Sequence, residues 1–220
     1  MAGGVGGMTA LEIPDADERN DLGAFIGRVV RLDAVATVRL RAAAGVVTAW
    51  ASTPFDVLAT RAVHGTLDPA DITVPASSLL TALSVERAGV VDPGTGGLWL
   101  GELPPVDGWV AVDTVPAEEV EQLTERGLTV ARENAGPLGP PASLLDQTVL
   151  TVSVEGGPQK PGMQVKVPMR CLFALSGMGF VAGGPGDAVR VSATGSWLRL
   201  DARYGAVVRR RITTLPLLLA

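Results

Sequence analysis

Apolar residues recur along this chain with two different periods, and each period predicts a different kind of element. Between residues 21 and 32 the apolar side chains are three or four positions apart, which places them on one face of an amphipathic helix. Elsewhere short runs alternate apolar and polar residues, as half-buried strands do. The expected strands cover residues 38–41, 46–51, 55–63, 72–74, 98–103, 109–115, 150–155, 165–167, 188–194, 197–202 and 206–212.

Three prolines mark the beginnings of further helices. Val74-Pro75 and Val167-Pro168 each open a short apolar run, and Pro116 opens a run with three glutamates in its first turn. Proline is tolerated in the first turn of a helix because the N–H that it lacks has no intrahelical partner there. We therefore expect a helix after each of these three prolines.

One segment of the chain occurs twice. Residues 38–63 align with residues 189–212, with Gly45 over Gly195 and Phe55 over Tyr204, and each copy is accompanied by a Val-Pro helix. Both copies predict short antiparallel strands joined by turns. The expected fold class is therefore α+β, built from repeated units of a short helix plus an antiparallel β-meander.

The chain is expected to have two halves. With 220 residues, of which 47% are apolar and 19% charged, it can form one large or two small globular domains. The GPLGPP sequence at residues 136–141 cannot continue a helix and marks the expected boundary. We expect an N-terminal α+β half at residues 21–135, a C-terminal α+β half at residues 142–220, and a flexible N-terminal tail at residues 1–20.

The repeated unit resembles the building unit of DNA sliding clamps, the processivity-factor fold. Residues 45–51 leading to residues 72–80 look like a clamp strand pair followed by its helix, and so do residues 167–172 leading to residues 189–200. The resemblance implies two clamp-like domains with helices facing an inner surface and sheets facing outward. It also implies rings that close by edge-to-edge strand pairing and tether enzymes to DNA without catalysis.

The charge of the chain restricts how it could contact nucleic acid. A formal net charge of −5 and a pI near 4.9 oppose a protein whose whole surface coats nucleic acid. The glutamates that follow Pro116 would also repel phosphates if their helix lined a channel. A locally basic face stays open, with surface salt bridges as the alternative interpretation. Its candidate residues are Arg28, Arg31, Arg39, Arg41, Arg209 and Arg211.

No arrangement typical of a catalytic, cofactor or metal site is found in the sequence. His64 is the one histidine and stands at a strand end, so an exposed turn residue explains it better than a general base. Cys171 lies in an apolar helical pattern, as a buried inert thiol does. Residues 177–182 fit G-x-G-x-x-A, with Asp201 further on, but a helix precedes them where a dinucleotide site needs a strand.

These observations favour a non-catalytic scaffold or interaction protein. Within this class, the resemblance to sliding clamps makes a clamp-like homo-oligomer the most specific hypothesis. Two alternatives stay open: an enzyme of unrecognised class with a cleft between the halves, and a small-ligand binding module that uses the four tryptophans. We expect no cofactor; the expected partners are copies of the chain and other proteins, and nucleic acid stays a candidate. The sequence shows neither a secretory signal nor ~18 consecutive apolar residues, so we expect a cytoplasmic protein without a membrane segment.

Overall fold

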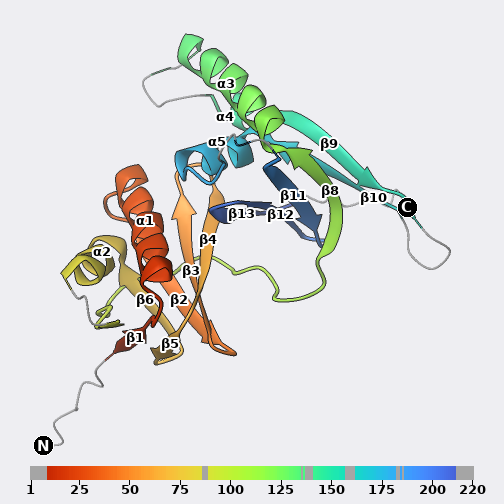
Figure 1. The fold of residues 1–220 in the computed structure, drawn as a ribbon. Coiled ribbons are helices and arrows are strands. Elements are labelled where there is room, and N and C mark those ends of the chain that lie inside the picture. Colours follow the sequence, from red (N-terminus) through yellow and green to blue (C-terminus); the bar gives the residue numbers. More distant parts are fainter. Residues whose placement is uncertain are drawn as a thin grey trace, which may run out of the picture. The chain divides into compact units, whose positions relative to one another are not determined.

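A computed structural model gives the fold and describes residues 9–85, 89–134, 136, 141–156, 162–181, 184 and 186–211 (Figure 1). Contacts divide the chain into two compact units. Unit 1 contains Met1–Pro54 and Thr60–Gly101, and unit 2 contains Phe55–Ala59 and Glu102–Ala220. Each unit has its own pair of packed helices and its own run of meander strands, and each is therefore described by itself.

Unit 1 combines two helices with antiparallel strands. One run of strands has the order β6-β2-β3-β4, a separate small sheet has the order β5-β1-β7, and α1 packs against α2. The elements are β1 (Ala10–Glu12), α1 (Ala16–Leu32), β2 (Thr37–Ala43), β3 (Val46–Thr53), β4 (Val57–His64), β5 (Thr66–Asp68), β6 (Asp71–Pro75), α2 (Ala76–Val85) and β7 (Val90–Val91). Residues 57–59 of β4 are grouped with unit 2.

Unit 2 has the corresponding parts in a different order along the chain. Its larger run of strands has the order β8-β11-β12-β13, β9 and β10 form a two-stranded sheet, and α3 packs against α5. The elements are β8 (Val110–Pro116), α3 (Ala117–Glu133), α4 (Ala142–Leu145), β9 (Thr148–Val154), β10 (Met163–Pro168), α5 (Met169–Gly177), β11 (Ala188–Ala193), β12 (Trp197–Ala202) and β13 (Gly205–Arg210).

Helix α1 buries the apolar face that the sequence predicts. Its buried side chains are Leu22, Phe25, Ile26 and Val29. The helix begins at Ala16, because the Asp15 carboxylate accepts hydrogen bonds from the first free N–H groups of the helix. Residues 9–20, which we expected in a flexible tail, therefore contain β1 and the first turn of α1. Residues 1–8 lie outside the described part of the chain.

The two units repeat the same strand register, which confirms an α+β fold of repeated units. In unit 1, β2 pairs with β6 so that Val38 lies opposite Val74; in unit 2, β11 pairs with β8 so that Val189 lies opposite Val115. The next meander strands, β3 with β12 and β4 with β13, follow in the same order. The alignment of residues 38–63 with residues 189–212 thus corresponds to a structural repeat as far as residue 211, the last described residue.

The Val-Pro helices pair differently from the sequence alignment. The counterpart of Val74-Pro75 is Val115-Pro116, because each step ends the strand that pairs with the first meander strand. Val167-Pro168 instead ends β10 and opens α5, which precedes the meander of unit 2 as α1 precedes that of unit 1. The alignment of Val74-Pro75 with Val167-Pro168 is therefore wrong, and the counterpart of α2 in unit 2 is α3.

Each unit contains one complete and one short copy of a β-α-β module. The complete modules, β1-α1-β2-β3-β4 and β10-α5-β11-β12-β13, have three strands after the helix. The short modules are β6-α2-β7 and β8-α3-β9, in which one strand follows the helix. After β7 the chain continues to β8, and after β9 it continues to β10, the first strand of the complete module. In each unit the strand that follows one helix pairs antiparallel with the strand that precedes the other helix.

The division between the units lies earlier than the boundary expected at residues 136–141. Strand β8 pairs with β11 and α3 packs on α5, so residues 110–133 join unit 2 although they precede the GPLGPP sequence. The expected strand at residues 98–103 is not formed. The segment before β8 is instead a loop, in which Trp109 Nε1 donates a hydrogen bond to the Pro105 carbonyl at 3.0 Å.

The contact between α3 and α5 depends on a glycine and generates a first prediction. A Cβ at Gly127 would lie 2.5 Å from Sδ of Met169 and 3.2 Å from Cε1 of Phe173, whereas a Cβ at Gly23 of α1 would meet nothing within 4 Å. Gly127→Val should lower the free energy of unfolding by about 2 kcal/mol through overpacking. Gly23→Val should leave it unchanged or raise it slightly, because valine has the higher helix propensity. Urea unfolding followed by circular dichroism measures both, and equal values for the two variants would contradict this packing.

Candidate functional site

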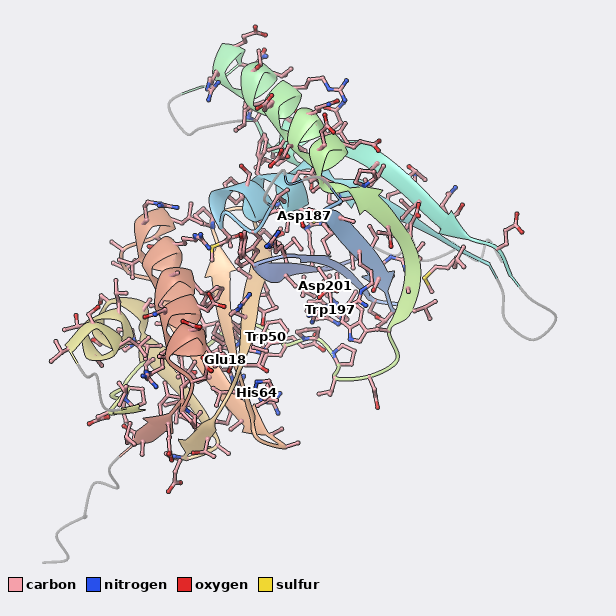
Figure 2. All side chains as sticks on the ribbon, viewed as in Figure 1. Glu18, Trp50, His64, Asp187, Trp197 and Asp201 are labelled. Carbon is pink, nitrogen blue, oxygen red and sulfur yellow. The ribbon has the colours of Figure 1, made fainter. Side chains whose placement is uncertain are left out.

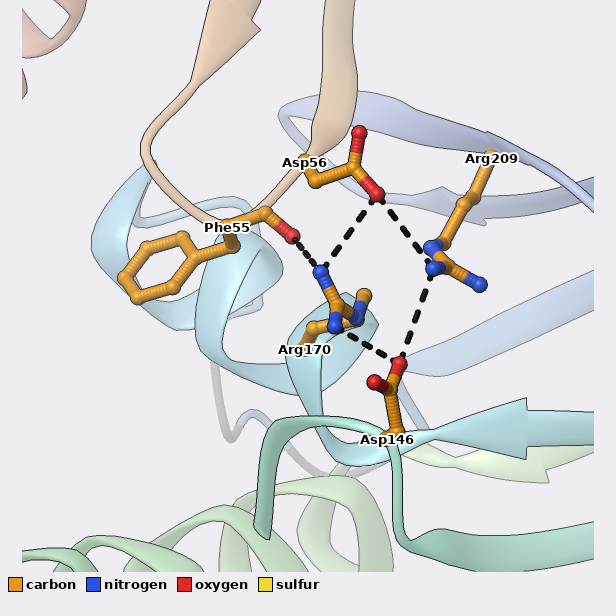
Figure 3. A network of polar contacts seen from close by, with 5 residues as sticks. All are labelled: Phe55, Asp56, Asp146, Arg170 and Arg209. Carbon is orange, nitrogen blue, oxygen red and sulfur yellow. Dashed lines mark hydrogen bonds and ion pairs between the residues drawn. The ribbon is translucent and has the colours of Figure 1, made fainter. Parts of the chain in front are cut away.

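Arg170 is the most buried charged residue among those that the structure describes, and it lies in the first turn of α5. Every residue from Met169 to Leu175 is buried, so the register of the helix carries this arginine into the core of unit 2. Its Nη1 donates to the carbonyl oxygen of Phe55 at 2.9 Å, and its Nη2 donates to Oδ1 of Asp146 at 2.6 Å (Figure 3). Nη1 also lies 3.4 Å from Oδ2 of Asp56.

A second arginine completes a network of two cations and two carboxylates. Nη2 of Arg209, on β13, lies 3.3 Å from Oδ2 of Asp56 and 3.6 Å from Oδ1 of Asp146. The side chains of Arg170 and Arg209 are only 9% and 14% exposed, whereas both aspartates reach solvent. Two cations therefore face two carboxylates, and the network joins α5, β13 and the segment before β9.

Three of the six arginines proposed for a basic surface face a carboxylate. Asp71 of β6 accepts two hydrogen bonds of 2.8 Å from Arg39 and lies 3.3 Å from Nε of Arg41, because β2 and β6 pair in register. The hydrogen bonds from Arg39 lower the pKa of Asp71, and the same bonds raise the pKa of Arg39. Arg209 is the third, in the network of unit 2. These three charges are neutralised locally.

The other three candidates have different surroundings. Arg211 donates to the backbone carbonyls of Thr194 at 2.8 Å and Gln164 at 3.1 Å. Arg28 and Arg31 lie on α1, and within the described residues neither forms an ion pair. Of the six candidates, Arg28, Arg31, Arg39 and Arg41 belong to unit 1, and Arg209 and Arg211 belong to unit 2. A single basic surface formed by all six stays a prediction.

His64 forms an ion pair with α1 (Figure 2). Its Nδ1 lies 2.7 Å from Oε1 of Glu18, and its backbone N–H also donates to that carboxylate. The side-chain hydrogen bond raises the pKa of His64 and lowers the pKa of Glu18. This surface pair joins β4 to α1 and explains the histidine without a catalytic role.

The remaining sequence candidates have structural explanations. Burial raises the pKa of the Cys171 thiol to about 12, so this cysteine is not a nucleophile. Helix α5 ends at Gly177 and residues 178–181 begin no new helix, so they lack the helix N-terminus that a dinucleotide site needs; residue 182 lies outside the described residues. In the described part of the chain, no three histidine, cysteine, aspartate or glutamate side chains are placed to hold a metal ion.

The tryptophans divide into two pairs. Trp50 on β3 and Trp197 on β12 are 9% and 7% exposed and belong to the cores of their units (Figure 2). Trp99 and Trp109 are half-buried and lie outside strands. No described helix is both long and apolar enough to cross a membrane.

The charged network of unit 2 generates a second prediction. Arg170→Met removes a buried cation with three polar contacts, and we expect the free energy of unfolding to fall by about 2 kcal/mol. Arg41→Met removes a half-exposed arginine with one contact to a carboxylate, and we expect a loss below about 1 kcal/mol. Urea unfolding compares the two variants. A loss for Arg170→Met as small as that for Arg41→Met would show that the network is not structural.

The pair of His64 and Glu18 generates a third prediction. Since His64 is the one histidine of the chain, its ring protons can be followed by NMR without overlap. The titration should show a pKa above the ordinary value of 6.5, and Glu18→Gln should return it toward that value. Asp17→Asn, one residue away, is the matched control and should leave it unchanged. An identical titration in the wild type and Glu18→Gln would rule out the ion pair.

The same pair sets a pH dependence of stability. The folded pKa of His64 is raised, so its contribution is complete below 6.5 and is lost as the pH rises through the folded value. The folded pKa of Glu18 is lowered, so its contribution is complete above 4.5 and is lost as the pH falls through the folded value. The pair therefore stabilises unit 1 most between these two ordinary values.

Comparison with solved structures finds the fold of bacterial DNA sliding clamps. The β sliding clamp of C. crescentus has a TM-score of 0.55 at 16% identity, over 94% of this chain and 66% of the clamp. A putative DNA polymerase III β subunit from Eubacterium rectale has 0.58 at 12% identity, over 95% and 66%. The Pseudomonas aeruginosa clamp has 0.54 at 14% identity, over 90% and 64%. The chain thus spans just under two thirds of these structures, and the likeness shows the fold alone.

Two family descriptions match the chain, and no curated protein does. Residues 8–98 match a domain of unknown function, DUF8010, and residues 104–214 match another, DUF8185. The interval between the two matches contains the point where unit 1 passes into unit 2, between Gly101 and Glu102. Since the second match covers half of the 220 residues, the chain belongs to the family of the domain of unknown function DUF8185.

Proposed function

We propose that this protein is a non-catalytic, clamp-like scaffold that acts by self-association and by contacts with other proteins. The observation that carries the proposal is the architecture: both units repeat the same register, and the chain matches sliding clamps over 90–95% of its length. In such a fold the repeated sheets offer strand edges, and strand edges are suited to pairing with another chain.

The chemistry of the described side chains supports a role without catalysis. The buried Cys171 thiol has a pKa near 12, and the histidine is held by Glu18 in an exposed ion pair. The most buried cation, Arg170, is neutralised by Asp146 and Asp56. None of these groups is both reactive and unengaged, as a nucleophile or general base has to be.

The charges on the helices favour proteins over DNA as partners. Helix α1 carries three acidic and three basic residues, and α3 carries five glutamates and two arginines, a net charge of −3. A surface that follows DNA phosphates needs an excess of Lys and Arg. Helices with this balance would not attract a duplex if they faced an inner surface as the clamp resemblance implies.

The two alternative functions have less support. A tryptophan-based ligand site would have to rely on Trp99 and Trp109, since Trp50 and Trp197 are nearly buried. An enzyme with a cleft between the halves stays a prediction, as does a cytoplasmic location. Neither is favoured by a feature of the described residues.

Light scattering after size-exclusion chromatography tests the proposed function. We expect a defined oligomer at micromolar concentration. Fluorescence anisotropy at low salt should detect no binding of a DNA duplex of about 30 base pairs. A monomer at every concentration would contradict the scaffold. Duplex binding that weakens steeply with salt would instead support a DNA tether.

A further inference from the structure

Strand β9 has one edge without a strand neighbour in its sheet. It pairs antiparallel with β10 from Leu150 opposite Val167 to Val154 opposite Met163. These two strands form a sheet by themselves among the strands that the structure describes. The other edge of β9 therefore presents backbone N–H and C=O groups along as many as seven residues.

The complete modules show what this edge lacks. After α5, strand β11 pairs with β8 on one side and with β12 on the other; after α1, strand β2 pairs with β6 and with β3. After α3, strand β9 pairs with β10 alone, and the chain continues directly to β10. The open edge of β9 is thus the position that β12 occupies beside β11. In the short module no described strand pairs at this position.

The sequence of β9 carries none of the side-chain features that usually protect an edge strand. The sequence of β9, TVLTVSV, contains no charged residue, no proline and no glycine, and four of its seven residues are valine or leucine. Such a segment pairs readily with further strands when it is left exposed.

Other edge strands of comparable length are protected. Strand β10 contains Lys166 and Pro168, and its Gln164 carbonyl accepts a hydrogen bond from Arg211. Strand β8 contains Asp113, whose carboxylate accepts a hydrogen bond from the N–H of Thr114. Strand β6 contains Asp71 and Pro75, and its Thr73 carbonyl accepts a hydrogen bond from the Gly97 N–H. Of these four edge strands, β9 is therefore the one with neither a charged residue nor a proline.

The composition of β9 fits a second copy of itself. In an antiparallel pair centred on Thr151, Leu150 would face Val152 of the other copy, and Thr148 would face Val154, so no charges would meet. Leu150, Val152 and Val154 share one face of the strand; Val152 is buried, and the other two are half-buried. Pairing would extend this apolar row across the two-fold axis. A charged peptide would find no complementary side chain on this strand.

We propose that β9 is the self-association edge of this protein: two copies pair antiparallel at β9, and each supplies the strand that the short module of the other lacks. The proposal rests on the self-association put forward above and names its interface. The resulting contact is isologous, so it closes as a dimer and does not propagate into a fibre.

Thr151→Glu is the variant that tests this interface. Thr151 is exposed and lies opposite Lys166 of β10, so a glutamate there gains a cross-strand partner within the unit. In the dimer, the same glutamate would meet its own copy at the axis. We expect the dissociation constant, measured by analytical ultracentrifugation, to rise at least about tenfold. The urea midpoint should stay unchanged. Gln164→Glu adds the same charge on the neighbouring strand and should leave the dissociation constant unchanged.

A mixture of variants gives the decisive result. Thr151→Glu mixed with Thr151→Lys should restore dimers, now of mixed composition, because opposite charges meet at the axis. If the oligomer persists in Thr151→Glu, the interface lies elsewhere and this inference fails, while the scaffold function stands. A monomeric wild type would overturn both.

Discussion

The proline at each strand-to-helix junction is the constraint on which the rest of this structure depends. A proline has no N–H, so it ends the hydrogen bonding of its strand and begins the helix without losing a bond. The first residue of the helix, which follows the proline, then donates its N–H to the carbonyl oxygen of the residue just before the partner strand. This hydrogen bond satisfies one of the N–H groups at the start of the helix that have no partner within the helix. These bonds, each 2.9 Å, are Ala76 to Ala36, Ala117 to Asp187 and Met169 to Gln147. Helix, strand and partner strand are therefore fixed together three times in the same geometry.

This junction explains how a clamp-like architecture can be kept while the rest of the sequence diverges. The junctions and the meander registers repeat within this chain, whereas the charges do not. Helix α3 is acidic, Arg39 and Arg41 face Asp71, and Arg209 lies beside Asp56 and Asp146. The likeness to sliding clamps at 12–16% identity is a likeness of backbone. The acidic α3 and the arginines paired with carboxylates in the described residues support the protein contacts that we propose over contacts with phosphates.

The parts of the fold that depend on local periodicity could be predicted from the sequence. The two-residue alternation identified β2, β3, β11 and β12, and the spacing of apolar residues identified α1. The sequence alone aligns Val74-Pro75 with the wrong Val-Pro step, because the chain contains three such steps with similar sequences. The hydrogen-bonded strand registers identify Val115-Pro116 as the counterpart. The partners of Arg170 were beyond reach for another reason: Phe55 and Asp146 are 115 and 24 positions away, and no local pattern marks them. The open edge of β9 likewise appears only once the modules are compared in three dimensions.

Amide hydrogen exchange of residues 148–154, followed one residue at a time at high and low protein concentration, tests the central claim most directly. In an antiparallel strand alternate N–H groups point to opposite sides, so one set bonds to β10 and the other points outward. The account predicts that the set facing β10 is protected at both concentrations and that the outward set is protected only at high concentration. Outward amides that exchange freely even at high concentration would contradict it.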